Sequence, residues 1–248
     1  MSARPVVLVT GSATGVGRAT AVRFAREGFN VVVNYSRSEA EARETCNLVA
    51  AAGGESQLFA CDVSNTPAVE QMLAEIDARW GKLDVLVNNA GTTFPVPHAN
   101  LDEMTEDKWD RILNVNVKAP FFVTRAAVPL LRKGANAAVV NVSSVAGLAG
   151  MGSSIAYCAS KGALNTMTKS LARVLAPEIR VNAVCPGPID TRWLRTWMNE
   201  EQIQAFVADY PIPRCATPDD IADTIYYLAR GTSLTTGQLL VVDGGRVM

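Results

Sequence analysis

Short runs of β-branched and other apolar residues alternate along the chain with longer segments in which apolar residues recur at helical spacing. The short runs are typical of strands buried on both faces, and the longer spacing is typical of amphipathic helices. The predicted strands cover residues 6–10, 31–34, 57–61, 85–88, 138–142, 181–184 and 239–242. The predicted helices cover residues 16–27, 38–52, 67–80, 106–133, 156–175 and 218–229. This alternation predicts an α/β fold with a parallel sheet of about seven strands and helices on both faces.

One long segment, from about residue 186 to 216, departs from the alternation and is predicted to be irregular. In an open α/β sheet, a long excursion after the carboxyl end of a strand is where ligands bind. No repeat, low-complexity tract or Gly/Ser-rich linker divides the chain. We therefore expect one domain over residues 1–248, with a substrate lid at about 186–216.

Composition excludes several classes of function. The 23 basic and 24 acidic residues are interspersed and give a net charge of -1, so we expect neither nucleic-acid nor membrane binding. The only histidine is His98, and the five cysteines form no C-x-x-C pair, so we expect no metal site. The first apolar run is too short for a membrane span and lacks the flanks of a secretion signal, which predicts a cytoplasmic protein.

Glycines 11, 15 and 17 follow the first predicted strand and open the first predicted helix. Without side chains at these positions, backbone amides can approach a pyrophosphate that rests on the positive end of the helix. Glycines also mark ordinary strand-to-helix turns, so this spacing alone is a modest signal. Its position between a strand and a helix favours a dinucleotide site.

The second predicted strand ends in Asn34-Tyr35-Ser36-Arg37, with no acidic residue before Glu39. A carboxylate at this point normally binds the ribose of NAD, whereas an arginine accommodates the additional phosphate of NADP. Ser36 and Arg37 can both donate hydrogen bonds to that phosphate, so we expect NADP(H) to be favoured over NAD(H). The alternative is that Arg37 is simply a solvated loop residue.

Tyr157 and Lys161 stand four residues apart, and Ser144 lies thirteen residues before Tyr157. Residues at a spacing of four share one face of a helix, so an ammonium can lie beside a phenol. We expect this cation to lower the pKa of Tyr157 from its usual value near about 10, which would make the phenol a usable proton donor or acceptor. Such pairs also occur on solvated helix faces, so the interpretation depends on the glycine loop.

With these residues assembled, the chain resembles the classical short-chain dehydrogenase/reductases over essentially its full length. The resemblance depends on seven motifs at the family's spacing. They are Thr10-Gly11-x-x-x-Gly15-x-Gly17, Asp62-Val63, Asn88-Asn89-Ala90-Gly91, Asn114-Val115-Asn116-Val117, Asn141-Val142-Ser143-Ser144, Tyr157-x-x-x-Lys161, and Pro186-Gly187 followed by Ile189-Asp190-Thr191. The resemblance implies a Rossmann-type, doubly wound sheet and an NAD(P)-dependent oxidoreductase that acts on carbonyl and alcohol groups.

The resemblance also implies a role for each catalytic residue. Tyr157 would exchange a proton with the substrate oxygen, and Ser144 would hydrogen-bond the same oxygen. Lys161 would lower the pKa of Tyr157 and bind the nicotinamide ribose, while Asn116 would hold a water that links Lys161 to solvent. Ser143 is an alternative to Ser144, which only the family's spacing favours. The implied cofactor contacts are Gly11, Thr14, Gly15, Val16, Gly17, Ser36, Arg37, Asp62, Val63, Asn89, Ala90, Gly91, Tyr157, Lys161, Pro186, Gly187, Ile189 and Thr191.

Apolar residues recur at helical spacing between residues 193 and 198, and they predict a lid over an apolar substrate. Such a stripe is more often core or subunit interface, which remains an alternative. We expect a neutral, largely apolar carbonyl substrate. The candidate pocket residues are Phe94, Val96, Ser144, Ala149, Met151, Trp193 and Trp197.

The pattern is most similar to 3-oxoacyl-acyl-carrier-protein reductases, and the alternatives are reductases of another small ketone, a sugar or a steroid-like compound. An acidic carrier protein would favour a basic patch, for which the candidates are Arg132, Lys133, Arg192, Arg195 and Arg214. A non-catalytic NADP(H) sensor is an alternative of another class, and a hydrolase using His98 is a weaker one. The resemblance also implies a homo-oligomer, a tetramer or a dimer, to which the apolar strand before Asp243-Gly244-Gly245 would contribute.

Overall fold

The computed structural model describes residues 4–247 and contains one parallel sheet in the order β3-β2-β1-β4-β5-β6-β7. The strands are β1 (Val6–Val9), β2 (Asn30–Tyr35), β3 (Ser56–Ala60), β4 (Val85–Asn88), β5 (Ala137–Val142), β6 (Ile179–Pro186) and β7 (Leu239–Val242). The order reverses between β1 and β4, which pair with each other in the middle of the sheet. Connections after β1 and β4 leave in opposite directions at such a point and open a crevice at the carboxyl ends of the strands.

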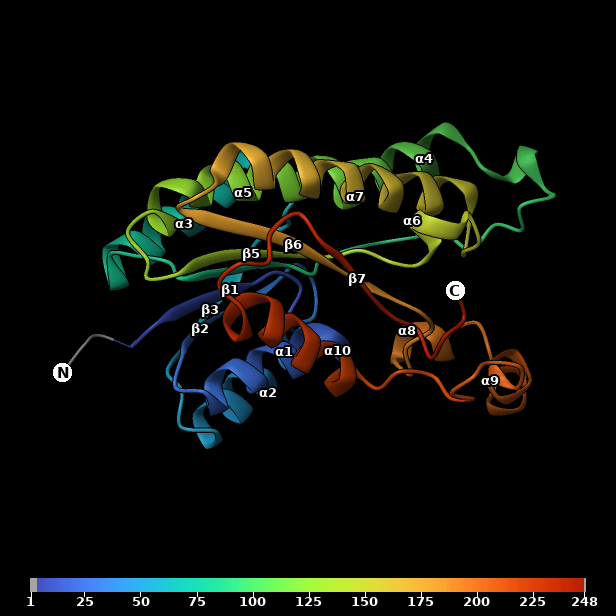
Figure 1. Ribbon diagram of the computed structural model, residues 1–248, viewed down its shortest axis with the longest axis horizontal. Helices are drawn as coiled ribbons and strands as arrows, with labels where there is room; N and C mark the ends of the chain where they lie inside the picture. The colour runs from blue at the N-terminus through green and yellow to red at the C-terminus, as the bar shows by residue number, and fades with distance from the viewer. Residues whose placement is uncertain (1–3, 248) are drawn as a thin grey trace.

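Helices cover both faces of this sheet, as Figure 1 shows. One layer contains α3, α5 and α7, and the other contains α1, α2 and α10. The helices are α1 (Gly15–Arg26), α2 (Glu39–Ala51), α3 (Thr66–Trp80), α4 (Glu106–Leu113), α5 (Ala119–Leu131), α6 (Ala146–Ala149), α7 (Ile155–Leu175), α8 (Arg192–Arg195), α9 (Glu200–Val207) and α10 (Pro218–Tyr226). The predicted doubly wound α/β fold is confirmed.

Two large hydrophobic clusters, one on each face of the sheet, make up the core. Alternate residues of β1 divide between them, with Val6 and Leu8 in one cluster and Val7 and Val9 in the other. All four are fully buried. Alternation along a strand sends neighbouring side chains to opposite faces, so a strand covered on both sides must be apolar throughout. This explains why the strands were recognisable as continuous apolar runs.

The predicted single helix over residues 106–133 is wrong, because the structure divides it into α4, a π-helical turn at Asn114–Lys118 and α5. A π-helical turn inserts an extra residue and rotates the following side chains relative to the preceding ones. Helical periodicity continues across such a turn with only a small phase change, so the pattern alone does not reveal it. The turn contains Asn116, one of the candidate catalytic residues.

The segment after β6 is more ordered than predicted, because it contains α8 and α9. A capping box begins α9: the Asn199 side chain accepts a hydrogen bond from the Gln202 amide, and the Gln202 side chain accepts one from the Asn199 amide. This reciprocal pair satisfies two donors that a helix start leaves free. Both helices lie beyond the carboxyl ends of the central strands (Figure 1).

Candidate active site

The glycine loop between β1 and α1 has the geometry of a close-approach turn. Gly11 and Gly15 have φ values of 62° and 55°, in the left-handed region that favours glycine. Gly17 is required for a different reason, because a Cβ there would lie 2.4 Å from the Gly11 carbonyl oxygen and 2.6 Å from Asn89 Nδ2. The three glycines therefore keep the loop tight against α1 and leave its amides accessible.

Three polar side chains hold this loop from neighbouring strands. Asn89 Nδ2 donates to the carbonyl oxygens of Thr10 at 2.8 Å and Gly11 at 3.0 Å. The Thr10 hydroxyl accepts hydrogen bonds from the amides of Asn89 and Ala90, both at 3.0 Å. Asn34 Oδ1 accepts from the Gly11 amide at 3.0 Å, while its Nδ2 donates to the Cys61 carbonyl at 3.0 Å. Asn34 thus joins β1, β2 and β3, a role that sequence analysis missed because asparagine at a strand end also suits an ordinary turn.

The outer end of the cleft carries the candidate residues for the adenosine part of a nucleotide. Ser36 and Arg37 are exposed and line the cleft, and Arg37 has no hydrogen bond or ion pair within residues 4–247. Asp62 accepts hydrogen bonds from the Ser64 amide at 2.9 Å and from Arg111 Nη2 at 3.2 Å. Burial works to raise the pKa of Asp62, but these hydrogen bonds outweigh it and lower the pKa. Asp62 is therefore a charged acceptor at neutral pH.

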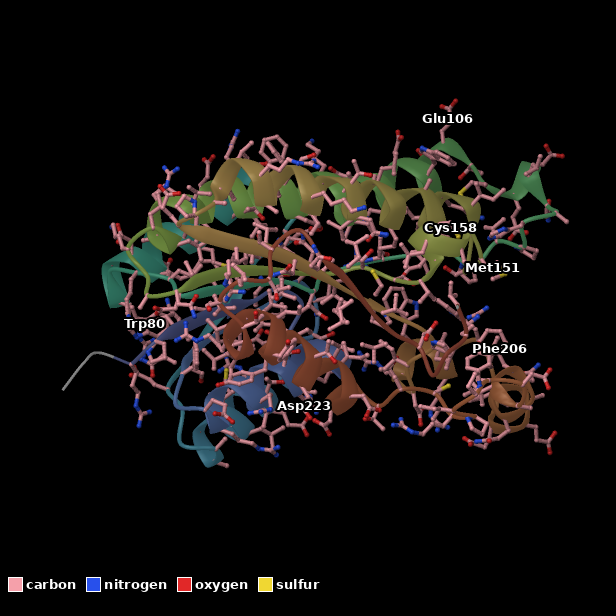
Figure 2. All side chains as sticks on the ribbon, viewed as in Figure 1. Trp80, Glu106, Met151, Cys158, Phe206 and Asp223 are labelled. Carbon is pink, nitrogen blue, oxygen red and sulfur yellow. The ribbon has the colours of Figure 1, made fainter. Side chains whose placement is uncertain are left out.

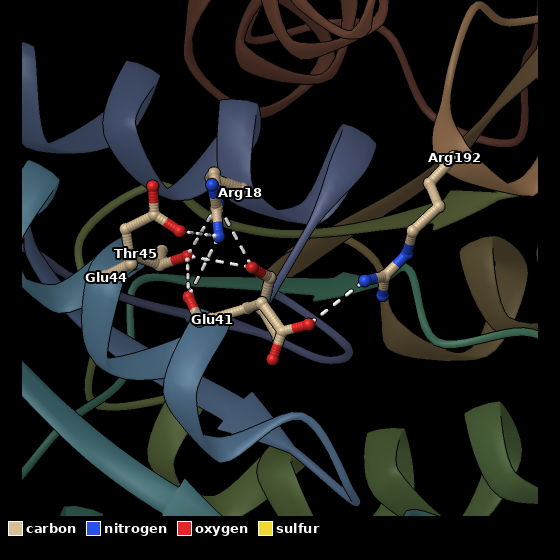
Figure 3. A network of polar contacts seen from close by, with 6 residues as sticks. Arg18, Glu41, Glu44, Thr45 and Arg192 are labelled. Carbon is tan, nitrogen blue, oxygen red and sulfur yellow. Dashed lines mark hydrogen bonds and ion pairs between the residues drawn. The ribbon is translucent and has the colours of Figure 1, made fainter.

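A polar network connects the glycine loop, α2 and the lid at the same end (Figure 3). Arg18 donates to the Ala13 carbonyl at 3.0 Å, to Thr45 Oγ1 at 3.1 Å and to the Glu41 carbonyl at 3.0 Å. The Glu41 carboxylate in turn pairs with Arg192 of α8 at 3.0 Å. Arg192 also lines the cleft, so this ion pair joins the two sides of its mouth.

Tyr157 and Lys161 lie on consecutive turns of α7, which begins at Ile155. The Ser154 side chain caps the helix and accepts a hydrogen bond from the Tyr157 amide at 3.2 Å. Lys161 is 4% exposed, and its Nζ donates to the Val142 carbonyl at the end of β5 at 2.9 Å. The same Nζ lies 5.6 Å from the centroid of the Tyr157 ring. The predicted proximity of the two side chains is therefore present.

The predicted lowering of the Tyr157 pKa by Lys161 is not found in the structure. Burial raises the pKa of Tyr157 to about 12, although a hydrogen bond with Ser144 works in the opposite direction. Burial also lowers the pKa of Lys161 to about 8. Both groups lose the hydration that would stabilise their charged forms, and this loss is the largest cause of each shift. In the protein chain by itself, Tyr157 is a protonated phenol at neutral pH.

The structure distinguishes the two adjacent serines. Ser143 is 4% exposed, and its hydroxyl donates to Asn165 Oδ1 at 2.6 Å. Ser144 is only partly buried, and its hydroxyl accepts a hydrogen bond from the Ala146 amide at 3.1 Å. Neither hydroxyl has His98 as a hydrogen-bond partner within residues 4–247; the His98 ring nitrogen instead lies 4.0 Å from Cys158 Sγ. Ser144 is thus the better placed hydroxyl, and the hydrolase alternative loses its base.

Asn116 lies behind Lys161, where it connects the π-helical turn to two neighbouring segments. Its Oδ1 accepts from the Thr92 amide at 2.8 Å, and its Nδ2 donates to the Thr92 carbonyl at 2.9 Å. Its Nδ2 also donates to Ser160 Oγ at 3.1 Å, and Ser160 Oγ donates to the Tyr157 carbonyl at 2.7 Å. Through Ser160, the side-chain amide of Asn116 is fixed relative to the first turn of α7. Ser160 was not identified from the sequence.

A cleft of roughly 630 Å³ runs from Arg37 to Tyr157 along the carboxyl ends of the strands. It gathers every candidate cofactor contact that the resemblance implied, from Gly11 to Thr191. A Cβ at Gly91 would lie 3.7 Å from Lys161 Nζ, so a bare backbone here keeps space beside the ammonium. The cleft also has lining residues that were not predicted, namely Asn34, Cys61, Thr92, Arg111, Val115, Val142, Arg192 and Thr196.

A second, more apolar pocket of roughly 470 Å³ opens between α6, the start of α7, α8 and α9. Trp193 packs edge to face on Tyr157 at 6.4 Å and on Trp197 at 5.9 Å between ring centroids. Met151 and Phe206 contribute from opposite sides, and Figure 2 shows both at the same end of the molecule. The pocket is lined by His98, Ser144, Val145, Ala146, Met151, Gly152, Ser153, Tyr157, Gly187, Pro188, Ile189, Thr191, Trp193, Leu194, Trp197, Met198, Phe206 and Arg246.

Three candidate substrate residues do not line this pocket. Val96 is 3% exposed, and its amide donates to the Ser153 carbonyl at 2.9 Å, which places it behind the wall. Ala149 ends the short helix α6 and is absent from the lining of both cavities. Phe94 lines the cofactor cleft rather than the apolar pocket. The sequence made these residues candidates for the pocket wall, but it did not give the directions in which their side chains point.

Within residues 4–247, no three histidine, cysteine or acidic side chains are grouped closely enough to hold a metal ion. In the same part of the chain, no helix combines the length and the apolar character needed to cross a bilayer. All five cysteines are free thiols.

Comparison with known proteins agrees with this geometry. The family model described as enoyl-(acyl carrier protein) reductase matches residues 11–246. A protein of Streptomyces violaceoruber, assigned as ketoacyl reductase 2 of the granaticin polyketide synthase, is 42% identical over 97% of this chain and 95% of its own. The 3-oxoacyl-[acyl-carrier-protein] reductase of Thermotoga maritima is 36% identical over 98% of both chains.

A solved structure gives the same result. A Burkholderia xenovorans protein assigned as a short-chain dehydrogenase/reductase superposes with a TM-score of 0.93 and 39% identity, covering 99% of this chain and 98% of its own. The sequence matches and this superposition extend over nearly the whole chain, including the glycine loop, the serine that follows β5, and the tyrosine and lysine of α7. The chain belongs to the short-chain dehydrogenase/reductase family and is an oxidoreductase that acts on CH–OH or C=O groups.

Proposed function

We propose that this protein is an NADP(H)-dependent carbonyl reductase in which Tyr157 donates the proton. The observation that carries the proposal is the position of Ser144, Tyr157 and Trp193, which line both the nucleotide cleft and the apolar pocket. A carbonyl compound in the pocket and a nicotinamide in the cleft would meet at these side chains. A reaction between two bound molecules gains most of its rate from such positioning.

The cleft fits a nicotinamide dinucleotide. Gly11 and Gly15 leave the amides at the start of α1 accessible, which suits a pyrophosphate. Asp62 would bind the adenine end, and the unpaired Arg37 would face the 2′-phosphate of NADP(H). Lys161 lies at the opposite end, where it would bind the nicotinamide ribose. The chemistry that such a cofactor supplies when bound is hydride transfer.

The side chains of this protein supply the proton. A pKa raised to about 12 keeps the Tyr157 phenol protonated at neutral pH, which suits a donor to the oxygen of a carbonyl group that is being reduced. Ser144 would donate a second hydrogen bond to the same oxygen and stabilise its developing charge. Lys161 and Asn116, which are 4% and 1% exposed, would return a proton to Tyr157 through a bound water.

The substrate is proposed to be a small carbonyl compound rather than one delivered by a docked carrier protein. Four of the five basic residues considered for carrier docking already have acidic partners. Lys133 pairs with Asp77, and the other three pairs are Arg192–Glu41, Arg195–Asp190 and Arg214–Asp220. Such pairing leaves little net positive field for an acidic partner. A 3-oxoacyl thioester remains the second candidate, since two of the relatives above carry that activity in their names.

The test is NADPH oxidation with a panel of ketones and 3-oxoacyl thioesters, comparing the wild type with Tyr157→Phe. Removing the proton donor while keeping the ring should lower kcat by about 10²- to 10⁴-fold. Ser143→Ala is a matched control at an adjacent hydroxyl that is turned into the core. Undiminished turnover by Tyr157→Phe would exclude the proton-transfer role. A protein that binds NADPH tightly but reduces nothing in the panel would instead support the sensor alternative.

The cofactor preference is tested by comparing NADPH with NADH in the wild type and in Arg37→Gln. Loss of a charge-assisted hydrogen bond to phosphate should raise the KM for NADPH by about tenfold or more and leave the KM for NADH nearly unchanged. Arg26→Gln, on the surface of α1, serves as the control for a lost positive charge. Equal effects on the two cofactors would contradict the assignment of Arg37.

We also infer a cytoplasmic homo-oligomer in which β7 contributes to a subunit interface. This strand forms one edge of the sheet, and its Leu240 and Val241 are 37% and 36% exposed. Exposed apolar side chains on an edge strand are typical of a surface that a second subunit covers. Light scattering of the wild type and of Leu240→Lys would test this, since a monomeric wild type contradicts it.

A further inference from the structure

The apolar pocket contains one side chain that sequence analysis did not consider, Arg246 in the C-terminal turn. No aspartate or glutamate is among the described residues that line the pocket, and its other titratable groups are Tyr157 and His98. A guanidinium stays charged at every physiological pH. The sequence predicted a pocket for a neutral compound, whereas the structure gives it a permanent cation.

Aromatic rings of the lid position this cation. The central carbon of the guanidinium lies 4.7 Å from the centroid of the Phe206 ring and 5.7 Å from that of Tyr210. Phe206 itself lines the pocket. Stacking on aromatic faces compensates part of the hydration that an arginine loses, but it uses none of the five N–H donors. Within residues 4–247 no hydrogen bond or ion pair engages the guanidinium, so no described residue uses its donors.

Hydrogen bonds and close packing hold the backbone around Arg246 in a defined turn, which fixes where this side chain starts. Asp243 is 8% exposed, and its carboxylate accepts hydrogen bonds from the Gly245 amide at 2.9 Å and the Val247 amide at 2.8 Å. Gly244 and Gly245 have φ values of 69° and 86°. A Cβ at Gly244 would lie 2.8 Å from the Ile212 carbonyl oxygen, so the turn packs directly against the lid segment. The Ile212 amide also donates to the Gly244 carbonyl at 2.9 Å.

An unpaired arginine at the edge of an acid-free apolar pocket favours an anionic ligand. A carboxylate suits it best, because the planar guanidinium can donate two parallel hydrogen bonds to the two carboxylate oxygens. The low polarity of the surrounding side chains strengthens such a contact relative to one in water. A neutral apolar ligand would bury part of the guanidinium without replacing its hydrogen bonds with water, which is unfavourable.

We propose that Arg246 selects substrates that carry a carboxylate, so that the enzyme reduces oxo acids with an apolar body. The carbonyl oxygen would lie at Ser144 and Tyr157, the apolar body would lie along Trp193 and Trp197, and the carboxylate would reach Arg246. The reaction adds a hydride to the carbonyl carbon and a proton to its oxygen, and the carboxylate is unchanged. This inference rests on the proposed reductase function and adds the class of its substrate.

The kinetic test compares phenyl-substituted oxo acids of increasing chain length with their methyl esters and with an oxoacyl thioester. For the wild type we expect the acid of best length to have a KM about tenfold or more below that of its ester. Arg246→Gln should raise the KM for the acid by a similar factor and change the KM for the ester much less. Arg246→Lys should recover part of the loss, because it restores charge without the planar fork.

Arg173→Gln, at the exposed end of α7, is the control and should change neither KM. Ester and acid that are reduced equally well by the wild type would overturn the role of Arg246, as would an Arg246→Gln variant with an unchanged preference. Better turnover of the thioester than of any acid, independent of Arg246, would also overturn it. In each of these cases the reductase function itself would stand.

A binding measurement separates the two proposals. Isothermal titration calorimetry would compare a non-reacting phenylalkanoate with its neutral amide, using the wild type and Arg246→Gln. We expect the carboxylate to bind about tenfold or more tightly than the amide to the wild type only. This result without turnover of any carbonyl would overturn the proposed reductase function while supporting the anion site. Equal binding of carboxylate and amide would overturn the anion site.

Discussion

The nucleotide cleft and the lid are built in different ways, although they meet at Tyr157. The cleft is formed by strand ends whose polar residues are almost fully buried, such as Thr10 at 2% and Asn34 at 1% exposure. The lid instead has a small hydrophobic cluster of its own, centred on Ile203, Val207 and Cys215, separate from the two large clusters beside the sheet.

This difference explains what each region can do. Cooperative hydrogen bonds to buried backbone fix the cleft, so its geometry changes only if the sheet itself is disrupted. A small separate cluster has few contacts to lose, and such regions open at a lower free energy than the whole domain. We therefore expect a rigid cleft beside a segment, residues 192–216, that opens more readily than the sheet.

The largest expected difference between the regions is in the free energy of unfolding, which the burial of the Lys161 ammonium in the cleft lowers. Its pKa is about 8 in the folded protein and ordinarily about 10.5, so between these values the unfolded chain binds more protons than the folded one. The free energy of unfolding therefore rises with pH across this window, and the penalty is complete below pH 8. Relative to Lys161→Met, the wild type should gain about 2 kcal/mol between pH 7.5 and 10.

Urea denaturation at the two pH values, with no cofactor added, measures this gain. Lys169→Met, which removes an exposed lysine from the same helix, serves as the control. A constant difference between the wild type and Lys161→Met at all pH values would show that the buried ammonium carries no such penalty.

The next effect concerns the glycine loop. Gly17→Ala places a methyl group within 3 Å of two backbone atoms, Gly11 O and Ser12 Cα, and should destabilise the protein by about 1–3 kcal/mol. Gly162→Ala in α7 makes the same change where the Cβ would meet only Gly147 O at 3.5 Å, and should be neutral or stabilising by up to about 1 kcal/mol. Thermal unfolding of both variants gives the comparison, and a Gly17→Ala protein as stable as the Gly162→Ala protein would refute it.

The smallest expected effect is a difference in hydrogen exchange between the lid and the sheet, and it can be measured on the wild type. Amides of α9 should exchange with deuterium faster than those of β4, β5 and β6, because the lid can open without unfolding the sheet. Hydrogen-exchange mass spectrometry on peptides from residues 192–216 and 179–186 measures the contrast directly. Equal protection in the two sets of peptides would mean that the lid is part of the same cooperative unit as the core.

Much of the cleft was predictable because its requirements are local. A glycine is needed where the backbone turns left-handed or where α1 packs on the loop, and residues at a spacing of four share a helix face, so both features are visible in the sequence. The candidate contacts from Gly11 to Thr191 do meet in one cleft. Their individual roles remain predictions.

Other features of the site depend on the directions of side chains and on the distances between segments, which the sequence does not give. The burial that raises the pKa of Tyr157 outweighs the nearby ammonium, and only the packing around α7 decides which is larger. Likewise, Val96 and Ala149 are close to the site in sequence yet turn away from it. Arg246 is 89 residues from Tyr157 in the chain, and the C-terminal turn brings it into the same pocket.

The sequence by itself determined the alternation of strands and helices, the doubly wound sheet, and the family to which the chain belongs. These follow from periodicity and from short motifs, which act over a few residues. The tertiary structure determined the π-helical turn at Asn116, the distinction between Ser143 and Ser144, the separate cluster around Ile203 and the cation in the apolar pocket. Those features arise from contacts between segments far apart in the chain, because burial and electrostatic interactions depend on distance in space.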